Sequence, residues 1–324
     1  MRFVAKFRQC MCVVALGLLV SAQSGADDFP NRPVRVVMGA PAGSSVDFLI
    51  RTMAIEMQAD LGQPIVVDNR PGADGIIAAQ LVVRAPSDGY TIMAATHTQL
   101  VATPVAFAKA PYDVERDFLP LSMLTDNQVV VAVHPSVAAR TLKELSDNAR
   151  LRTGGLQVGS GSTTFMFMAD ALGRMIGAEF QHIPYTGQVA TMQAVLGGQV
   201  QVAILDSTVA LDAIRAGRLR ALAVGGSTRL AVLPDVPTLA EAGFSGFDAG
   251  LWIAMVAPAG VPDAIANRLR RSIVRALDSK GVRDRLLAMA IVPRASSPAQ
   301  LIEEVRAGQA ATVRQMQQLG IAPK

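Results

Sequence analysis

Cysteine and histidine are scarce in this chain of 324 residues, which contains two cysteines and three histidines. Both cysteines, Cys10 and Cys12, lie near the N-terminus. A zinc site requires several cysteine or histidine ligands at a characteristic spacing, and none of the three histidines falls in such a pattern. We therefore expect no metal site, and a folded chain without disulfide bonds.

Clusters of basic residues are also missing, since no run of lysine or arginine is longer than two residues, as at Arg270 and Arg271. The formal net charge of +4 owes much to Arg2, Lys6 and Arg8, which lie in a first segment without any acidic residue. The rest of the chain is close to neutral and lacks the basic excess that binding to a phosphate backbone requires. We expect no nucleic-acid partner.

The sequence motifs of common enzyme sites are absent. A G-x-S-x-G nucleophile elbow is not found, and the nearest strings, Gly159-Ser160-Gly161 and Gly243-Phe244-Ser245-Gly246, do not fit it. The chain also lacks the phosphate-binding loop G-x-x-x-x-G-K-[ST], and no G-x-G-x-x-G fingerprint follows its first predicted strand. We expect a protein that is not an enzyme and that uses no cofactor. The alternative is a hydrolase that uses Ser44 or Ser45 with His97, which a turnover assay would detect.

Long hydrophobic stretches are confined to the N-terminal segment, since no later stretch reaches the ~18 apolar residues typical of a membrane-spanning helix. Residues 1–8 are basic, residues 10–20 are apolar, and Ser24-Gly25-Ala26 places small residues where signal peptidase cleaves. Residues 1–26 therefore predict a signal peptide cleaved near Ala26, and a product located in the bacterial periplasm. The alternative is a membrane anchor, but ~11 apolar residues fall short of the ~20 needed to span a bilayer.

The remaining chain alternates strand-like apolar runs with segments of helical periodicity, which is typical of an α/β fold. The pattern begins with a strand over 34–38, a helix over 47–61 and a strand over 65–68, and it restarts with a strand that ends at residue 159. Two sheets, and hence two lobes, are the simplest interpretation. Because no linker-like composition separates them, we expect the chain to cross between the lobes, one formed by residues 27–129 plus 250–324 and the other by residues 130–249.

Two helices carry clear start signals. Thr141 and Glu144 form a T-x-x-E capping pair before a helix that begins at Leu142. Ser297 and Gln300 form a similar pair before a helix over 298–319. The C-terminal part of the chain is therefore expected to be helical.

Small polar loops, two of which contain glycine, follow three of the predicted strands. They are residues 41–45 (PAGSS), 96–98 (THT) and 160–164 (SGSTT). In open α/β sheets, ligands bind outside the carboxyl ends of the strands, where helix N-termini expose free N–H groups that attract anions. The loops therefore predict an anion site that needs no lysine or arginine. The alternative is that the serines and threonines only cap helices.

Several short motifs run through the chain in order: residues 29–35 (FPNRPVR), 68–73 (DNRPGA), 86–91 (PSDGYT), 196–200 (LGGQV), 217–223 (GRLRALA) and 233–238 (LPDVPT). In sequence and order, these motifs resemble those of the extracytoplasmic solute receptors of tripartite tricarboxylate transporters, known as the Bug or TctC type. The resemblance spans nearly the whole chain after residue 26. It implies a two-lobed periplasmic binding fold of type II-like architecture, in which each lobe is a mixed sheet flanked by helices and the ligand cleft lies between the lobes.

The resemblance also implies that the lobes close on a small organic carboxylate, which is held by loop N–H groups, hydroxyls and ordered waters. The two carboxylates that it assigns to the site, Asp47 and Asp206, are open to two interpretations, because each either accepts a hydrogen bond from the ligand or caps a helix. Carried over position by position, the ligand-binding residues are Ala42, Gly43, Ser44, Ser45, Asp47, Thr96, His97, Thr98, Ser160, Gly161, Ser162, Thr163, Thr164, Tyr185, Thr186, Gly187 and Asp206.

Some positions depart from the pattern of the family that the chain resembles. Ala42 stands where relatives usually have proline or glycine, and Thr186 stands where lysine is common. Phe165 and Phe167 follow the third loop, where relatives often carry polar residues or histidine. We expect both phenylalanines to pack in the core, since aromatic residues at helical spacing usually point inward. If either faces the cleft, an aromatic or longer apolar carboxylate becomes the favoured ligand.

The sequence thus predicts a periplasmic receptor, expected to be a monomer, that captures a small organic carboxylate and delivers it to the permease of a tripartite tricarboxylate-type transporter. Strands near 129–133 and 251–257 are expected to act as the hinge on which the closed form is selected. The alternative is a receptor that presents its liganded form to a membrane sensor.

Overall fold

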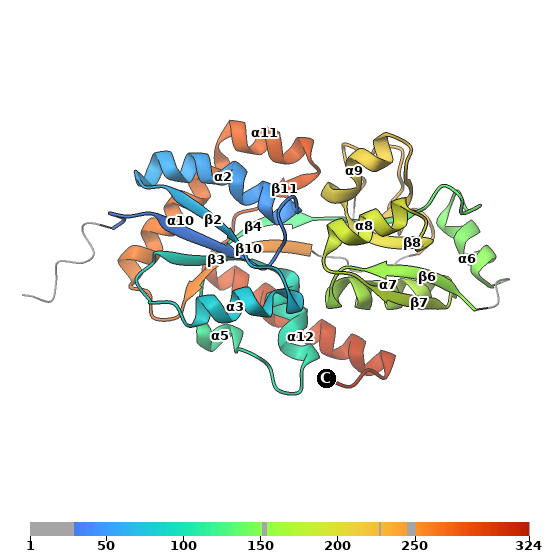
Figure 1. Ribbon diagram of the computed structural model, residues 1–324, viewed down its shortest axis with the longest axis horizontal. Helices are drawn as coiled ribbons and strands as arrows, with labels where there is room; N and C mark the ends of the chain where they lie inside the picture. The colour runs from blue at the N-terminus through green and yellow to red at the C-terminus, as the bar shows by residue number, and fades with distance from the viewer. Residues whose placement is uncertain (1–28, 151–153, 227, 245–250, 324) are drawn as a thin grey trace, which may run out of the picture.

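The structure is a computed structural model that describes residues 29–150, 154–226, 228–244 and 251–323. The predicted signal peptide, residues 1–26, lies outside these residues. Two separate mixed sheets, each flanked by helices, lie side by side (Figure 1). We refer to the six-stranded sheet with its helices as the first lobe, and to the five-stranded sheet with its helices as the second lobe. The α/β class predicted from the sequence is confirmed.

The first lobe has the strand order β11-β4-β10-β3-β1-β2. β1 pairs in parallel with both β2 and β3, whereas β10 runs antiparallel to β3 and β4, and β11 runs antiparallel to β4. The parallel strands therefore all end at the same edge of the sheet. The strands are β1 (Val34–Met38), β2 (Ile65–Asn69), β3 (Thr91–Thr96), β4 (Phe118–Asn127), β10 (Leu251–Pro258) and β11 (Ile291–Pro293).

The second lobe repeats this mixed arrangement in the order β7-β6-β8-β5-β9. β6 pairs in parallel with β7 and β8, and β5 runs antiparallel to β8 and β9. The parallel strands again share one carboxyl edge. The strands are β5 (Val129–Val133), β6 (Leu156–Ser160), β7 (Phe180–Pro184), β8 (Val202–Asp206) and β9 (Arg220–Val224).

Helices cover both faces of each sheet (Figure 1). In the first lobe α2, α10 and α11 pack on one face, while α3 and α12 pack on the other. The helices of this lobe are α2 (Ser45–Leu61), α3 (Ile76–Val83), α4 (Thr103–Ala106), α5 (Val114–Asp117), α10 (Asp263–Asp278), α11 (Lys280–Ala288) and α12 (Pro298–Leu319), with the short turns η1 (Ala73–Gly75) and η2 (Thr98–Ala102). Those of the second lobe are α6 (Leu142–Arg150), α7 (Thr163–Ile176), α8 (Gln188–Leu196) and α9 (Ser207–Arg215).

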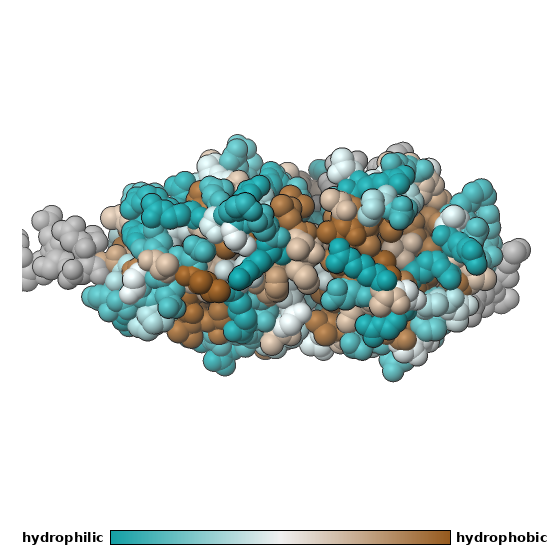
Figure 2. Space-filling model, turned by 90° about the horizontal axis from the view of Figure 1, so that it is seen from above, coloured by the Kyte–Doolittle hydropathy of each residue, from teal (hydrophilic) through white to brown (hydrophobic). Residues whose placement is uncertain are grey.

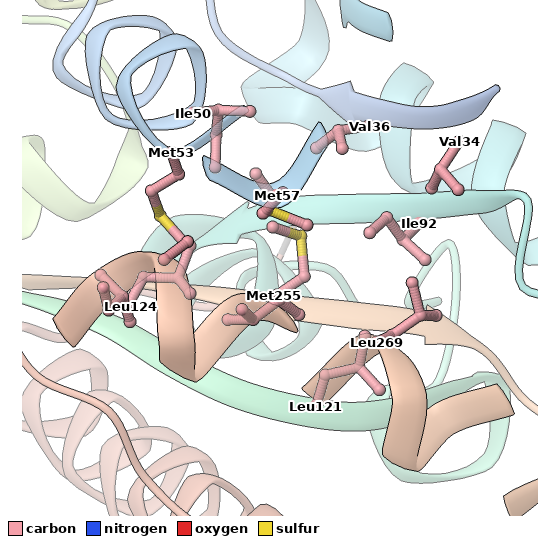
Figure 3. Packing of buried hydrophobic residues seen from close by; sticks show 14 of the residues in the cluster. Val34, Val36, Ile50, Met53, Met57, Ile92, Leu121, Leu124, Met255 and Leu269 are labelled. Carbon is pink, nitrogen blue, oxygen red and sulfur yellow. The ribbon is translucent and has the colours of Figure 1, made fainter. Parts of the chain in front are cut away.

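Buried strands supply apolar side chains to both faces of the first sheet. In β1, Val34 and Val36 join the core beneath α2, while Val37 joins the core on the opposite face. This alternation follows from the two-residue period of a strand. Met53 and Met57 of α2 lie over the first of these faces (Figure 3). Because helices cover both faces of the sheet, the sequences of the buried strands are continuous apolar runs and do not alternate between apolar and polar residues.

The chain passes from the first sheet to the second through a single residue, Gln128, between β4 and β5. Its return path, before β10, lies outside the described residues. Near the C-terminus, α12 reaches across to the second lobe, where the side-chain amide of Gln315 donates to the Phe167 carbonyl at 2.8 Å. The two lobes therefore contact each other at the crossing, around the site described below, and through α12.

Most elements expected from the sequence are present, with some differences. The capping box of Ser297 and Gln300 is confirmed in full. At α6 the Thr141 hydroxyl accepts from the Glu144 N–H, but the Glu144 carboxylate accepts from the N–H of Arg140 rather than from that of Thr141. The helical segment formed by η2 and α4 was not expected, and neither was the short strand β11.

Candidate ligand-binding site

A cavity of about 410 Å³ lies between the two lobes. In the first lobe it is lined by the segments that follow β1, β2 and β3 and by the start of β10, and in the second lobe by those that follow β6, β7 and β8. The carboxyl edges of the parallel strands in both sheets thus face the same space, which is where α/β folds bind ligands. Seen from above, apolar residues lie on both lobes where the two meet (Figure 2).

Five helices begin at this cavity. The residues just before α2, α3, α7, α8 and α9 all contribute to its lining: Ser44, Gly75, Ser162, Gly187 and Asp206. A helix N-terminus presents backbone N–H groups and the positive end of the helix dipole, and a nearby anion gains ~0.3–1 kcal/mol from each such end. Several ends together can hold an anion without a basic side chain.

Eleven of the seventeen predicted site residues line the cavity. Whether they contact a ligand stays a prediction, but the structure does bring them together from both lobes. They are Ser44, Ser45, Thr96, His97, Thr98, Gly161, Ser162, Tyr185, Thr186, Gly187 and Asp206.

The other six predicted residues, Ala42, Gly43, Asp47, Ser160, Thr163 and Thr164, do not belong to the lining. Ser160 turns to the imidazole of His182, its hydroxyl lying 3.3 Å from Nδ1, and His182 Nε2 in turn lies 2.5 Å from the carboxylate of Asp170. Thr163 and Thr164 are used in contacts between the lobes, described below.

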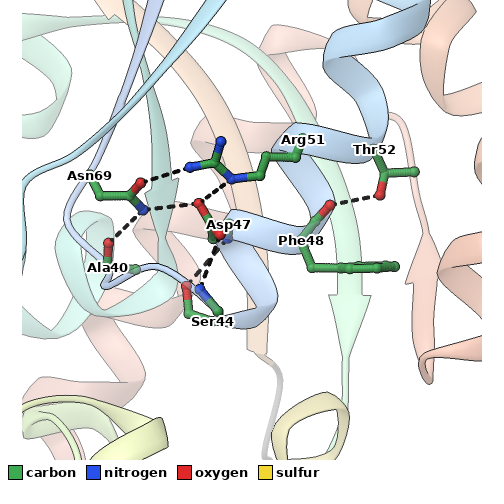
Figure 4. Close-up of polar contacts among 8 residues, drawn as sticks. Ala40, Ser44, Asp47, Phe48, Arg51, Thr52 and Asn69 are labelled. Atoms are coloured by element: carbon green, nitrogen blue, oxygen red, sulfur yellow. Dashed lines mark hydrogen bonds and ion pairs between the residues drawn. The ribbon is translucent and has the colours of Figure 1, made fainter.

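Asp47 stabilises the first loop, residues 41–45, by hydrogen bonds and does not itself line the cavity. Its carboxylate accepts from the Gly43 N–H at 3.0 Å, from the Asn69 amide at 3.1 Å and from Arg51 at 2.9 Å (Figure 4). Burial alone would raise the pKa of Asp47, but these hydrogen bonds outweigh it and hold the pKa below its usual value. Gly43 has φ of 79°, a left-handed conformation that favours glycine. The helix itself is capped by Ser44, whose hydroxyl accepts from the Asp47 N–H.

Asp206 lies at the start of α9, with only 6% of its surface exposed. One oxygen accepts from the Thr208 N–H at 2.9 Å, and the other from the Ser45 hydroxyl at 2.9 Å and the Asn127 amide at 3.4 Å. Burial raises the pKa of Asp206, and the hydrogen bonds oppose this rise only in part. Because Ser45 belongs to the first lobe, Asp206 both caps α9 and joins the two lobes.

Two further groups of hydrogen bonds join the lobes around the cavity. The carboxylate of Asp74, in the segment after β2, accepts from the backbone N–H of Thr163 at 3.2 Å and from the Thr163 hydroxyl. The Thr98 hydroxyl lies 3.0 Å from that of Thr164 and 3.4 Å from that of Ser162. Three sets of hydrogen bonds therefore join the two lobes around the cavity.

The sequence analysis did not assign several residues that line the cavity. Gln188 and Asn127 are two of them, and the buried amide nitrogen of Gln188 and amide oxygen of Asn127 have no hydrogen-bond partner among the described residues. The motif that contains Pro71, Gly72 and Ala73 was recognised, but neither it nor the following Asp74 was linked to the site. Only the fold brings these residues to the cavity.

Aromatic side chains also line the cavity. Phe107 and Trp252 come from the first lobe and Phe165 from the second. The ring of Trp252 meets that of His97 edge to face, with centroids 5.4 Å apart. Phe165, which we expected in the core, contacts both the core and the cavity, whereas Phe167 is buried and does not belong to the lining.

Two α/β lobes that close on a cavity lined by strand ends and helix N-termini define a solute-binding protein of the two-lobed class. Comparison with known proteins narrows this class. The family profile described as "Tripartite tricarboxylate transporter family receptor" (TctC) matches residues 49–320. Protein BugT of Bordetella pertussis is 33% identical over 284 residues, which are 87% of each chain.

Solved structures agree with this family. The R. palustris protein Rpa4515 with adipate has a TM-score of 0.88 and 29% identity, and the match covers 92% of this chain and 100% of that one. MatC from Rhodopseudomonas palustris with bound malate has a TM-score of 0.83 and 31% identity, over 89% of this chain and 99% of that one. The chain therefore belongs to the tripartite tricarboxylate transporter receptor family, the Bug or TctC type, which is a family of periplasmic solute receptors and not of enzymes.

Proposed function

We propose that this protein captures a small organic carboxylate in the cavity between its lobes and delivers it to the permease of a tripartite tricarboxylate-type transporter. The observation that carries the proposal is the convergence of five helix N-termini on one cavity, in a chain of this receptor family. Structures similar to this chain contain adipate and malate, both of which are carboxylates. The carboxylate would take its hydrogen bonds from backbone N–H groups and neutral side chains.

Within this proposal, the eleven lining residues predicted from the sequence contact the ligand or its waters. Gln188 is added to them, because it is the first residue of α8, it belongs to the cavity lining, and its amide nitrogen has no hydrogen-bond partner among the described residues. Asp206 and Thr98 would also act on closure, as would Thr164, since their hydrogen bonds join the lobes. Ligand binding then stabilises the closed form because the ligand contacts both lobes only when they meet, and the bonds between the lobes add to the stability of that form.

We further propose that the protein works in the periplasm as a monomer, after removal of residues 1–26. Among the described residues, no helix combines the length and the apolar character needed to cross a membrane. The lobes would comprise residues 27–129 plus 250–324 and residues 130–249, with the hinge at the crossing near Gln128. The permease, or a membrane sensor as the alternative partner, would recognise the closed form.

The hydrolase alternative has less support. The Ser45 hydroxyl donates to Asp206 and the Ser44 hydroxyl accepts from a backbone N–H, which is the role of a helix cap. The imidazole of His97 meets the Trp252 ring. A turnover assay with carboxylic esters separates this alternative from a receptor, because a receptor releases its ligand unchanged.

The proposal is tested by substituting Ser162 with aspartate. Aspartate is as good a helix cap as serine, so the fold should be kept, but its carboxylate would occupy the N-terminus of α7 and repel an anion. Calorimetric titration with a panel of carboxylic acids should show binding to the wild-type protein and at least tenfold weaker binding to S162D. Gln199→Glu, which adds the same charge at an exposed position of the second lobe, is the control and should bind like the wild type. Equal binding by S162D would contradict the proposal.

A further inference from the structure

Acidic side chains outnumber basic ones in the described lining of the cavity. Among the described residues, its lining contains two carboxylates, Asp74 and Asp206, and neither lysine nor arginine. The helix N-termini can stabilise one carboxylate of a ligand, but a second would be buried without a cation and near two acidic side chains. Its desolvation would be offset only by the remaining helix N-termini, without a cationic side chain among the described lining residues. The lining therefore favours a ligand with one carboxylate.

Much of the remaining lining is apolar. Phe107, Phe165 and Trp252 contribute aromatic rings from both lobes, and five aliphatic residues extend this surface: Val46, Ile76, Val209, Leu251 and Ile253. Trp252 and Phe165 are only 5% and 7% exposed, so they sit in fixed positions within packed surroundings. Aromatic pairs gain free energy from stacking and edge-to-face contact beyond their burial of apolar area. Such a wall selects a ligand with a ring or another bulky apolar body.

The size of the cavity agrees with such a ligand. A volume of about 410 Å³ lies within the ~300–1,000 Å³ of sites that enclose ligands of drug-like size. A short aliphatic diacid would leave part of the apolar lining in contact with water. An arylalkanoic acid would cover that part while its single carboxylate reaches the helix N-termini.

We propose that this receptor selects monocarboxylic acids with an aromatic or similarly bulky apolar body over di- and tricarboxylic acids, and that Phe107, Phe165 and Trp252 determine this specificity. This inference rests on the proposed capture of a carboxylate in the cavity. It adds to that function the chemical class of the ligand, from the lack of lysine and arginine among the described lining residues and from the aromatic rings of Phe107, Phe165 and Trp252.

The test is isothermal titration of ligand-free protein with benzoate and phenylacetate on one side and malate, adipate and citrate on the other. At least one aromatic monocarboxylate should bind at least tenfold more tightly than each of the three others. Tighter or equal binding of malate, adipate or citrate would overturn the inference and leave the proposed function standing. If no acid of either kind binds, the proposed function fails as well.

Variants on α7 separate specificity from stability. Phe165→Leu removes a ring from the cavity lining, and the control Phe167→Leu removes the same ring from the core two positions along the same helix. F165L should weaken phenylacetate binding about tenfold, and F167L should leave it unchanged even if its melting temperature falls as much. Equal affinities of the two variants would overturn the role of Phe165.

A second pair of variants tests the charge argument. Thr186→Lys places a cation at the cavity, at an exposed position where the longer side chain has room. It should increase the affinity for adipate relative to phenylacetate at least tenfold, and the effect should weaken as the salt concentration rises. The exposed control Gln199→Lys should leave this ratio unchanged. An unchanged ratio in T186K would show that the missing cation does not set the preference.

Discussion

The hydrogen bonds between Asp74 and Thr163 lead to a testable prediction about how the two lobes close on the ligand. Asp74 belongs to the first lobe and Thr163 to the first turn of α7 in the second lobe, and they are 89 positions apart in the sequence. Thr163→Val removes only the hydroxyl donor, keeps the backbone N–H bond and nearly preserves the shape. Thr163 does not belong to the cavity lining, so a direct loss of ligand contact is not expected.

The magnitude follows from the type of bond. A hydrogen bond to a charged group contributes ~1.5–3 kcal/mol net, and the lower value applies here because Asp74 is only partly buried. If the bond exists only when the lobes are closed, its loss lowers the closed population by about that free energy. Each ~1.4 kcal/mol corresponds to a factor of ten, so the apparent Kd of T163V should rise about tenfold.

Two measurements check this prediction: titration with the tightest-binding acid of the panel, and chemical unfolding with and without that acid. The stability of T163V should fall mainly in the ligand-saturated state. Thr312→Val is the control, since the Thr312 hydroxyl donates to the Gly308 carbonyl within α12 and should not affect ligand affinity. A wild-type Kd for T163V, or an equal loss of stability in both states, would refute the closure role of this bond.

Two other substitutions test interactions that stabilise the first lobe. Burial opposes ionisation of Asp60, but the hydrogen bonds to its carboxylate, chiefly from Arg268 at 2.5 Å, hold its pKa below the usual value. A carboxylate with a lowered pKa stabilises the folded state at pH values above its unfolded-state pKa, and this stabilisation is lost as the pH falls. Asp60→Asn should therefore make the free energy of unfolding less dependent on pH in the acid range. The control Asp284→Asn, at an exposed site, should leave that dependence unchanged. Gly75→Ala should cost ~1–2 kcal/mol or more in urea unfolding, because φ is 83° and the added Cβ would lie 1.8 Å from the Gln99 amide nitrogen.

Local sequence patterns were sufficient for most of the fold. The first strand was predicted over residues 34–38, and the last helix over residues 298–319, with the bounds that the structure has. Both lie between proline, glycine or serine signals that act within a few residues. Residues 98–106 were not recognised as helical because no such signal precedes them: the residue before η2 makes no side-chain cap.

The loops of the candidate site could be predicted from the sequence, but the contacts between its two lobes could not. Ser44 and Ser162 could be placed at strand ends because the chain itself positions them there. The role of Asp74 depends on Thr163 in the other lobe, and no local pattern contains that information. Phe165 and Phe167 lie on the same short stretch of α7, and which one reaches the cavity depends on how the first lobe packs against that helix.

The most direct test of the account is a crystal structure of the protein with the tightest-binding acid of the panel. The carboxylate should lie inside the cavity between the lobes, within hydrogen-bond distance of backbone N–H groups in the first turns of two or more of the helices α2, α3, α7, α8 and α9. A carboxylate bound by the arginines on the outer face of α10, with the cavity holding no ligand, would contradict the claim that these helix N-termini form the receptor site.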